Sequence, residues 1–179
     1  EKLKHIVSKE AFNIDGLGKK VIDQFWDLKL IKMPSDIFKL NYNKVEKLEG
    51  WGNLSIKNLK KAVDNAKTIT LNRFIYSIGI RHIGQENAKL LARHLKSLGN
   101  FLKLSINKDF SELSNIDGIG KTQIKSIQNF FFNQTNLKVL SKLKEKLTVI
   151  DVAQVNDNGP LKDKTFMLTG KLDGISSHC

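Results

Sequence analysis

The chain has 179 residues, 40% of them apolar and 27% charged, and its 30 lysines and arginines against 18 aspartates and glutamates give a net charge of +12. This composition is typical of a globular protein, and no apolar run is long enough to cross a bilayer. The single cysteine, Cys179, excludes an internal disulfide framework and a cysteine-cluster zinc site within these residues. A reducing, cytosolic compartment is therefore predicted.

The positive charge is confined to the first part of the chain. Residues 1–150 contain 27 basic and 14 acidic side chains, a net charge of +13, whereas residues 151–179 contain 3 and 4, a net charge of −1. A basic body indicates a polyanionic partner, most commonly nucleic acid. A lysine-rich proteome would produce the same excess, so composition alone leaves both explanations open.

Residues 1–147 show the apolar periodicity of helices. Segments such as VIDQFWDL, SIKNLKKAV, NAKLLARHL and QIKSIQNFFF place apolar residues three and four positions apart. Strict alternation over the length of a strand is scarce. We therefore predict a mainly α-helical domain over residues 1–150, with Trp26 and the aromatic run 130–132 in its core.

Glycines punctuate these helices in a repeat with a period near 34 residues. Each copy reads apolar, acidic, Gly, apolar, Gly and then an amphipathic helix, except that a variant third copy has its glycines further apart. The pattern predicts one supersecondary unit repeated four times. The copies are NIDGLGKKVIDQF (13–25), KLEGWGNLSIKNL (47–59), SIGIRHIGQENAKLLA (77–92) and NIDGIGKTQIKSI (115–127), and their last glycines are Gly18, Gly52, Gly84 and Gly120.

The Gly-apolar-Gly centre of the repeat predicts a tight hairpin between two helices. Glycine tolerates positive φ, and the central apolar residue (Leu17, Trp51 or Ile119) can turn inward and hold the two helices together. The second glycine begins the following helix, whose first N–H groups have no intrahelical acceptor and lie at the positive end of the helix dipole. That end suits a phosphate oxygen, and without a Cβ the glycine lets a sugar-phosphate backbone come close.

This pattern resembles the helix-hairpin-helix motif, which binds the DNA backbone without reading sequence. A single Gly-x-Gly is a weak signal because helix-terminating glycines also produce it, but four copies on a basic chain are a strong one. Hairpin two lacks a lysine beside Gly52, which leaves a chiefly structural role open for it, and for His82 phosphate contact and plain solvation are both open. The predicted DNA-binding residues are the hairpin glycines and their polar neighbours: Gly16, Gly18, Lys19, Lys20, Gly50, Gly52, Arg81, His82, Gly84, Gly118, Gly120, Lys121 and Thr122.

A wider similarity connects these repeats to one enzyme family. The segments LKHIVSKEAFNIDGLGKKVIDQF, LEGWGNLSIKNL, LNRFIYSIGIRHIGQENAKLLARHL and GPLKDKTFMLTGKL occur in the order found in bacterial NAD-dependent DNA ligases, which the chain resembles over essentially its whole length. In that family an adenylation region, an OB-fold domain and a four-cysteine zinc module precede a tandem helix-hairpin-helix domain, and a BRCT domain follows. The resemblance implies a chain that begins just after the last zinc cysteine and holds the complete hairpin domain.

The last part of the chain differs in character. Residues 151–160, DVAQVNDNGP, are polar and turn-prone and predict a linker. By the same resemblance, residues 161–179 are the truncated start of an α/β BRCT domain, with 164–170 as its opening strand. A Thr-Gly at this place helps hold phosphate in some BRCT domains, but a strand end followed by a turn is the preferred interpretation of Thr169.

The segment TGKLDG (169–174) contains Lys-x-Asp-Gly, the signature of nucleotidyltransferases whose lysine takes up a nucleotide covalently. Such a lysine needs a pocket that binds the nucleotide and stabilises charge on its phosphate, built from motifs that follow the lysine in sequence. Only eight residues follow Lys171, so we interpret the match as a coincidence and Lys171 as a surface residue. No catalytic residue is predicted, and the four scattered histidines predict no metal site.

The resemblance implies a function for the whole ligase and a part in it for this chain. In the family NAD supplies AMP to the enzyme's lysine, AMP moves to the 5′-phosphate at a nick, and the 3′-hydroxyl displaces it; NAD, Mg²⁺ and a structural Zn²⁺ would be held upstream of residue 1. This chain is expected to bind double-stranded or nicked DNA as a monomer. Its expected location is the bacterial cytoplasm, at the nucleoid. It is expected to bind no cofactor and no membrane and to have no catalytic activity alone. The alternatives are a non-enzymatic helix-hairpin-helix DNA-junction or repair scaffold and a helix-hairpin-helix DNA glycosylase.

Overall fold

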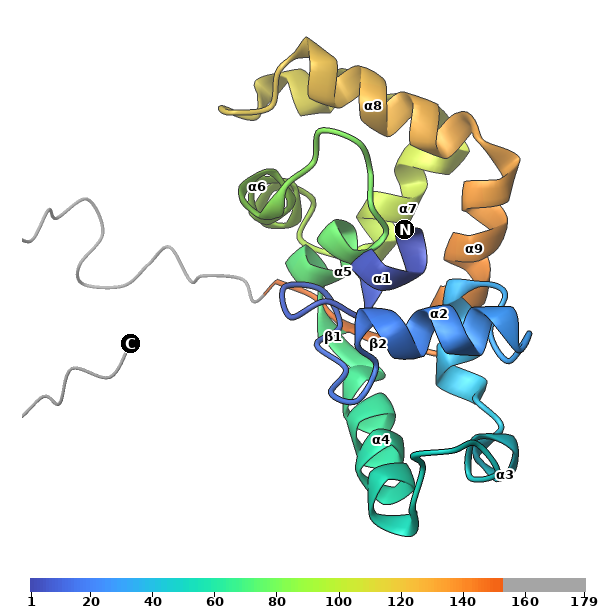
Figure 1. The fold of residues 1–179 in the computed structure, drawn as a ribbon. Coiled ribbons are helices and arrows are strands. Elements are labelled where there is room, and N and C mark those ends of the chain that lie inside the picture. The colour runs from blue at the N-terminus through green and yellow to red at the C-terminus, as the bar shows by residue number, and fades with distance from the viewer. Residues whose placement is uncertain (153–179) are drawn as a thin grey trace, which may run out of the picture.

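The computed structural model describes residues 1–152, and they form the mainly α-helical domain that the apolar periodicity predicts (Figure 1). The helices follow one another around a continuous apolar core that reaches from Leu3 to Leu143. The α-helices are α1 (Lys2–Ile6), α2 (Lys19–Asp27), α3 (Tyr42–Val45), α4 (Asn53–Ala66), α5 (Leu71–Ser77), α6 (Gln85–Leu95), α7 (Leu98–Asn107), α8 (Lys121–Phe132) and α9 (Gln134–Lys144), and η1 (Pro34–Lys39) and η2 (Ser111–Asn115) are 3₁₀ helices.

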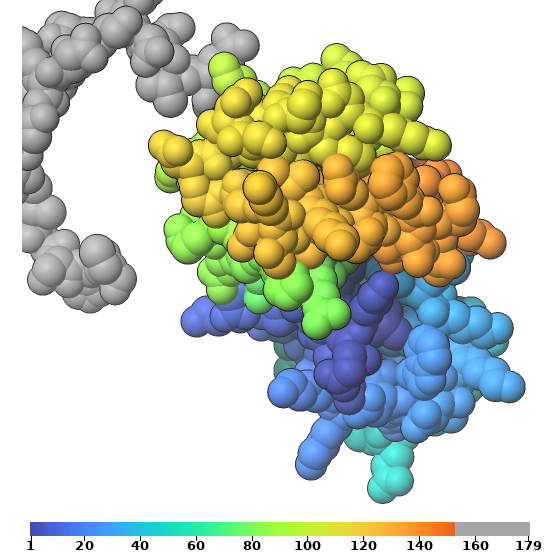
Figure 2. Space-filling model, turned by 90° about the horizontal axis from the view of Figure 1, so that it is seen from above, coloured from blue at the N-terminus to red at the C-terminus, as the bar shows by residue number. Residues whose placement is uncertain are grey.

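Four hairpins organise these helices. Hairpin one joins α1 to α2, hairpin two joins α3 to α4 and hairpin three joins α5 to α6. In hairpin four the first element is the 3₁₀ helix η2, which precedes α8, so this copy departs from two full α-helices. Figure 2 shows α8 and α9 (orange) lying over the molecule, with the N-terminal segment (blue) beside the third hairpin (green).

A short parallel pair of strands ties the middle of the domain to its end. Strand β1 (Thr68–Thr70) pairs with β2 (Thr148–Ile150), with Thr68 opposite Thr148. The helices between them form the long crossover that a parallel connection requires. The sequence did not indicate these strands, because three residues are too few to show an alternating pattern.

The inward-pointing residues of the hairpins are where the glycine pattern predicts them. Leu17 and Ile119 are buried, and the partly buried Trp51 packs against Phe25 of α2 with ring centroids 5.6 Å apart. The prediction for Trp26 was wrong. Its side chain is 52% exposed, because α2 buries the face that carries Ile22 and Phe25.

The aromatic run at the end of α8 is buried only in part. Phe130 and Phe131 belong to the core, and the ring of Phe131 lies 5.1 Å from that of Phe101. Phe132 is 53% exposed and meets only the edge of Phe110, with centroids 5.9 Å apart. The predicted core position is therefore right for the first two residues and wrong for the third, which lies on the outer face of the last helical turn.

A partly buried carboxylate shapes the connection between α2 and α3. Asp36 in η1 accepts hydrogen bonds from the backbone N–H groups of Lys32 and Met33 at 2.9 and 3.0 Å, and it lies 3.3 Å from the ammonium group of Lys39. Burial is the largest single influence and would raise the pKa of this carboxyl, but the hydrogen bonds and the lysine together hold the pKa below its ordinary value.

The first residues of the predicted linker are still part of the domain. The carboxylate of Asp151 accepts a hydrogen bond from the N–H of Leu98 at 3.0 Å, and the N–H of Val152 donates to the carbonyl of Lys96 at 2.8 Å. The remainder of the predicted linker and the predicted BRCT segment, with Thr169, Lys171 and Cys179, lie outside the described residues.

Candidate nucleic-acid interface

All four hairpins close with the same four-residue turn. In each, the N–H of the fourth residue donates to the carbonyl of the first, over 3.0 to 3.2 Å, and the third residue has a positive φ. A positive φ at this position is the mark of a type II turn and favours glycine. The bonds run from Leu17 to Ile14, Trp51 to Leu48, Ile83 to Ile80 and Ile119 to Ile116, and the third residues are Gly16 (φ 89°), Gly50 (83°), His82 (62°) and Gly118 (89°).

The structure explains the wider glycine spacing of the third copy. His82 stands at the turn position that glycine occupies in the other three hairpins. Gly79 (φ 68°) instead follows Ile78 at the end of α5, the ordinary place of a helix-terminating glycine. Counting back two positions from Gly84 would have found His82 in the sequence.

The second glycine of every hairpin caps the helix that follows, as predicted. Gly18, Gly52, Gly84 and Gly120 have extended backbones, and α2, α4, α6 and α8 begin at the next residue. The first helical hydrogen bond of α6 runs from the N–H of Ala88 to the carbonyl of Gly84, at 2.9 Å. The N–H groups of the three residues between them therefore have no acceptor within the helix.

Neither the backbone nor the packing of the described domain requires glycine at these capping positions. Their φ angles are between −66° and −94°, which any residue adopts. A Cβ added at Gly18, Gly52 or Gly84 would meet nothing within 4 Å, and one added at Gly120 would meet only the flexible end of Gln123, at 3.2 Å. The open space lies outside the protein, where a ligand can use it.

The turn glycines have a different purpose. At Gly118 an added Cβ would lie 2.8 Å from Cδ1 of Leu90 on α6, and at Gly16 it would lie 3.6 Å from Leu59 on α4. These glycines allow a positive φ and a close approach to the neighbouring hairpin. The hairpins therefore pack in pairs, one with two and three with four.

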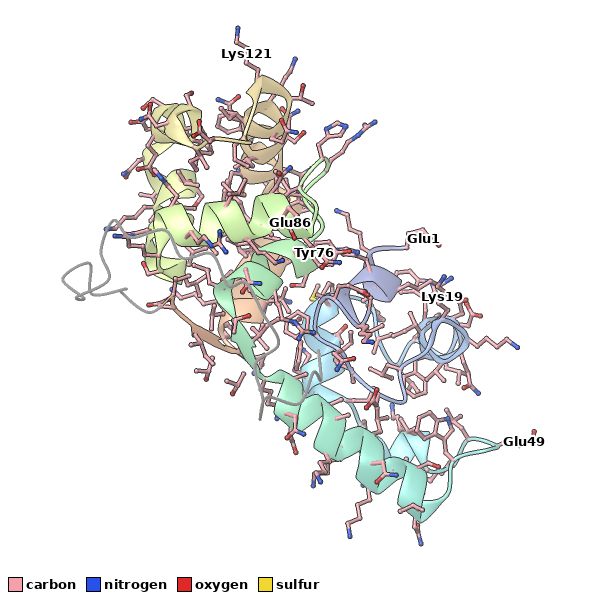
Figure 3. All side chains as sticks on the ribbon, turned by 90° about the vertical axis from the view of Figure 1, so that its left-hand side faces the viewer. Glu1, Lys19, Glu49, Tyr76, Glu86 and Lys121 are labelled. Carbon is pink, nitrogen blue, oxygen red and sulfur yellow. The ribbon has the colours of Figure 1, made fainter. Side chains whose placement is uncertain are left out.

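Charged residues stand beside three of the capped helix ends. Lys19, Lys20 and Lys121 are exposed in the first turns of α2 and α8, and Arg81 is exposed in the third turn. In Figure 3 the labelled Lys19, Glu49 and Lys121 lie along one side of the molecule, with the loop of the third hairpin between Lys121 and Lys19. The hairpin tips therefore face a common side.

Hairpin two differs in its chemistry. Glu49 is exposed in its turn, no basic residue adjoins Gly52, and Leu54 in the first turn of α4 is 71% exposed. Trp51 packs toward hairpin one. The tip is therefore acidic and apolar, which fits packing better than phosphate binding.

Two local features modify the third and fourth sites. In α8 the N–H of Gly120 is engaged by the side chain of Gln123 at 3.2 Å, and the carbonyl of the exposed Thr122 accepts a hydrogen bond from the Ser126 hydroxyl. In the first turn of α6, a hydrogen bond of 2.7 Å from Lys89 lowers the pKa of Glu86, and the charge of Lys89 adds to the effect. Glu86 therefore places a negative charge in the first turn of α6, close to the helix end at Gly84.

A cavity lies apart from the capping glycines, between α1, α2, α9 and the loop before α6. It has a volume of about 1040 Å³ and a mainly apolar lining that includes Trp26, Met33 and Leu140. Within residues 1–152, no three His, Cys, Asp or Glu side chains are grouped as metal ligands. No helix in this part of the chain is both long and apolar enough to span a membrane.

Comparisons with known proteins agree with this geometry. The helix-hairpin-helix motif family matches residues 73–140, which contain hairpins three and four. A DNA ligase from Pelagibacter ubique (strain HTCC1062) is 65% identical over 176 residues, which cover 98% of this chain and 26% of that protein. DNA ligases from Wolbachia pipientis wMel and Rickettsia canadensis (strain McKiel) are 43% and 39% identical over 98% of this chain and 28% and 27% of their own lengths.

The chain spans about a quarter of the length of the curated relatives it matches. Its repeated turns, its glycine-capped helices and the matching family all describe the same motif. The described residues thus form a domain of helix-hairpin-helix motifs, and the chain is a relative of part of the DNA ligases.

Proposed function

We propose that this chain binds double-stranded or nicked DNA through the sugar-phosphate backbone, without reading sequence, as the DNA-gripping part of an NAD-dependent DNA ligase. The observation that carries the proposal is the set of capping glycines with open space above them. A phosphate oxygen can approach the free N–H groups of such a helix end closely only where no side chain stands in the way.

The proposal assigns phosphates to hairpins one, three and four. Their helix ends at Gly18, Gly84 and Gly120 would offer backbone N–H groups. Lys19, Lys20, Arg81 and Lys121 would add full charges, which hold the DNA without contributing base selectivity. Hairpin two would support hairpin one through the contact between Trp51 and Phe25.

The chemistry of ligation is proposed for other parts of the whole protein. By the resemblance to these ligases, NAD, Mg²⁺ and Zn²⁺ would be bound by other domains of the whole protein. Incubation with labelled NAD tests this division: we expect no covalent AMP on the chain, and label on Lys171 would contradict it.

Titration of fluorescent nicked duplexes tests DNA binding directly. Two unrelated sequences should bind with the same affinity, and log affinity should fall with log salt concentration with a slope of about −0.9 for each phosphate contacted. Absence of binding, or strong dependence on sequence, would refute the proposal. A clear preference for a four-way junction over a nicked duplex would instead support the scaffold alternative.

A further inference from the structure

His82 has a backbone conformation that a residue with a side chain rarely adopts. Its φ of 62° lies in the left-handed region, at the turn position that glycine fills in the other three hairpins. Such a conformation persists only where the surroundings fix it, and glycine would adopt it without strain. Four other residues with side chains in the described domain also have a positive φ, so His82 is distinguished from them by the contacts of its ring and its carbonyl.

Two hydrogen bonds from different elements hold His82. The side-chain amide of Asn87 on α6 donates to the carbonyl of His82 at 3.1 Å. The ring Nδ1 of His82 lies 3.0 Å from Oγ of Ser126, which belongs to α8. The second bond ties the turn of hairpin three to the helix of hairpin four.

The neighbour of Ser126 sets the direction of this second bond. The Ser126 hydroxyl donates its one hydrogen to the carbonyl of Thr122 at 2.9 Å, so its oxygen accepts from His82. Nδ1 of His82 therefore carries a hydrogen. An asparagine could replace the ring, because its Nδ2 is a donor at the same distance from the backbone and asparagine tolerates the left-handed region.

This bond is one half of a reciprocal arrangement. From hairpin four toward hairpin three, Gly118, whose backbone is in the left-handed region, packs closely on Leu90 of α6. Ser126 and Leu90 each stand six residues after the glycine that caps their helix. Each turn therefore rests on the same place of the other hairpin's second helix, through a hydrogen bond on one side and an apolar contact on the other.

We infer that His82 is a positioning residue, whose hydrogen bond to Ser126 orients hairpin three on α8 so that the helix ends at Gly84 and Gly120 hold two phosphates of one DNA. The inference rests on the proposed function, because the relative orientation of two capped ends matters only if both hold the same ligand. Loss of the bond should weaken DNA binding even where no charge is removed.

A double-mutant cycle on the 179-residue chain tests the inference. His82→Gly and Ser126→Ala should each weaken binding to a nicked duplex roughly five-fold, the size of one hydrogen bond, and the double variant should be no weaker than either single one. His82→Asn keeps the donor and should bind within about two-fold of wild type. His94→Gln, at an exposed histidine of α6, is the matched control and should not change binding.

One further measurement keeps the outcomes distinct. Ring ¹⁵N resonances should report the Nδ1–H form of His82 in the wild type and a shift toward the Nε2–H form in the Ser126→Ala variant. Because Ser126→Ala does not alter the turn, this comparison tests the hydrogen bond even if His82→Gly fails to fold. Additive losses in the double variant, or no rescue by His82→Asn, would overturn this inference alone. A wild-type chain that binds no duplex would overturn the proposed function and the inference with it.

Discussion

Gly84→Val separates phosphate binding at a helix end from general attraction to a basic surface. The substitution changes no charge, and at Gly84 a Cβ meets nothing within 4 Å of the protein. The φ of −80° and ψ of −175° are extended values that valine adopts readily. The variant should therefore fold, and the loss of glycine as the N-cap should cost about 0.5–1 kcal/mol.

The effect on DNA should be much larger than the effect on stability. The valine side chain would occupy the space through which a phosphate approaches the first N–H groups of α6. A hydrogen bond to a charged group contributes about 1.5–3 kcal/mol, so the affinity for a nicked duplex should fall roughly ten-fold or more. The salt dependence should also decrease by about 0.9 in log–log slope, because one phosphate contact is lost.

Fluorescence anisotropy at several salt concentrations measures both quantities, after circular dichroism has confirmed folding. Lys144→Ala is the matched control, because it removes an exposed charge on α9, outside the four hairpins. It should weaken binding about two-fold at most, as a surface charge remote from the phosphates. A folded Gly84→Val variant with wild-type affinity and slope would refute phosphate binding at this helix end.

Three other substitutions test separate features. Gly118→Ala should destabilise the domain by about 3 kcal/mol in denaturant unfolding, because the new Cβ would clash with Leu90 and because the φ of residue 118 is positive. An unchanged denaturation midpoint would contradict the packing described. Glu86→Gln should strengthen DNA binding roughly two- to three-fold in anisotropy titrations, because it removes a negative charge from the first turn of α6. Weaker binding would show that Glu86 does not oppose the DNA. The pKa of Asp36 is lowered in the folded state, so the stabilisation that its carboxylate gives is present above the unfolded-state pKa and is lost as the pH falls through the folded-state pKa. Asp36→Asn should lower the free energy of unfolding by about 1 kcal/mol at pH 7 and should make that free energy fall less steeply in acid. Wild type and variant whose stabilities fall in parallel with pH would contradict this.

The sequence by itself determined the helical character of the domain and the starts of the four helices that follow Gly18, Gly52, Gly84 and Gly120. Apolar spacing is a local signal, and a glycine at a helix start or at a positive φ acts through its own backbone, so the turn at Gly16 and the helix start at Gly18 could be predicted without knowledge of distant residues. The similarity to DNA ligases was also visible in the sequence, because it lies in the order of whole segments.

Only the tertiary structure decided how the repeats meet one another. The pairing of β1 with β2 joins segments far apart in the chain, and the exposure of Trp26 depends on which face of α2 its neighbours cover. The partners of His82 and Gly118 lie on helices of other hairpins, so no local pattern could distinguish a glycine kept for packing from one that leaves room for a ligand. Contacts between elements depend on the relative placement of distant segments, which side-chain periodicity along one helix does not encode.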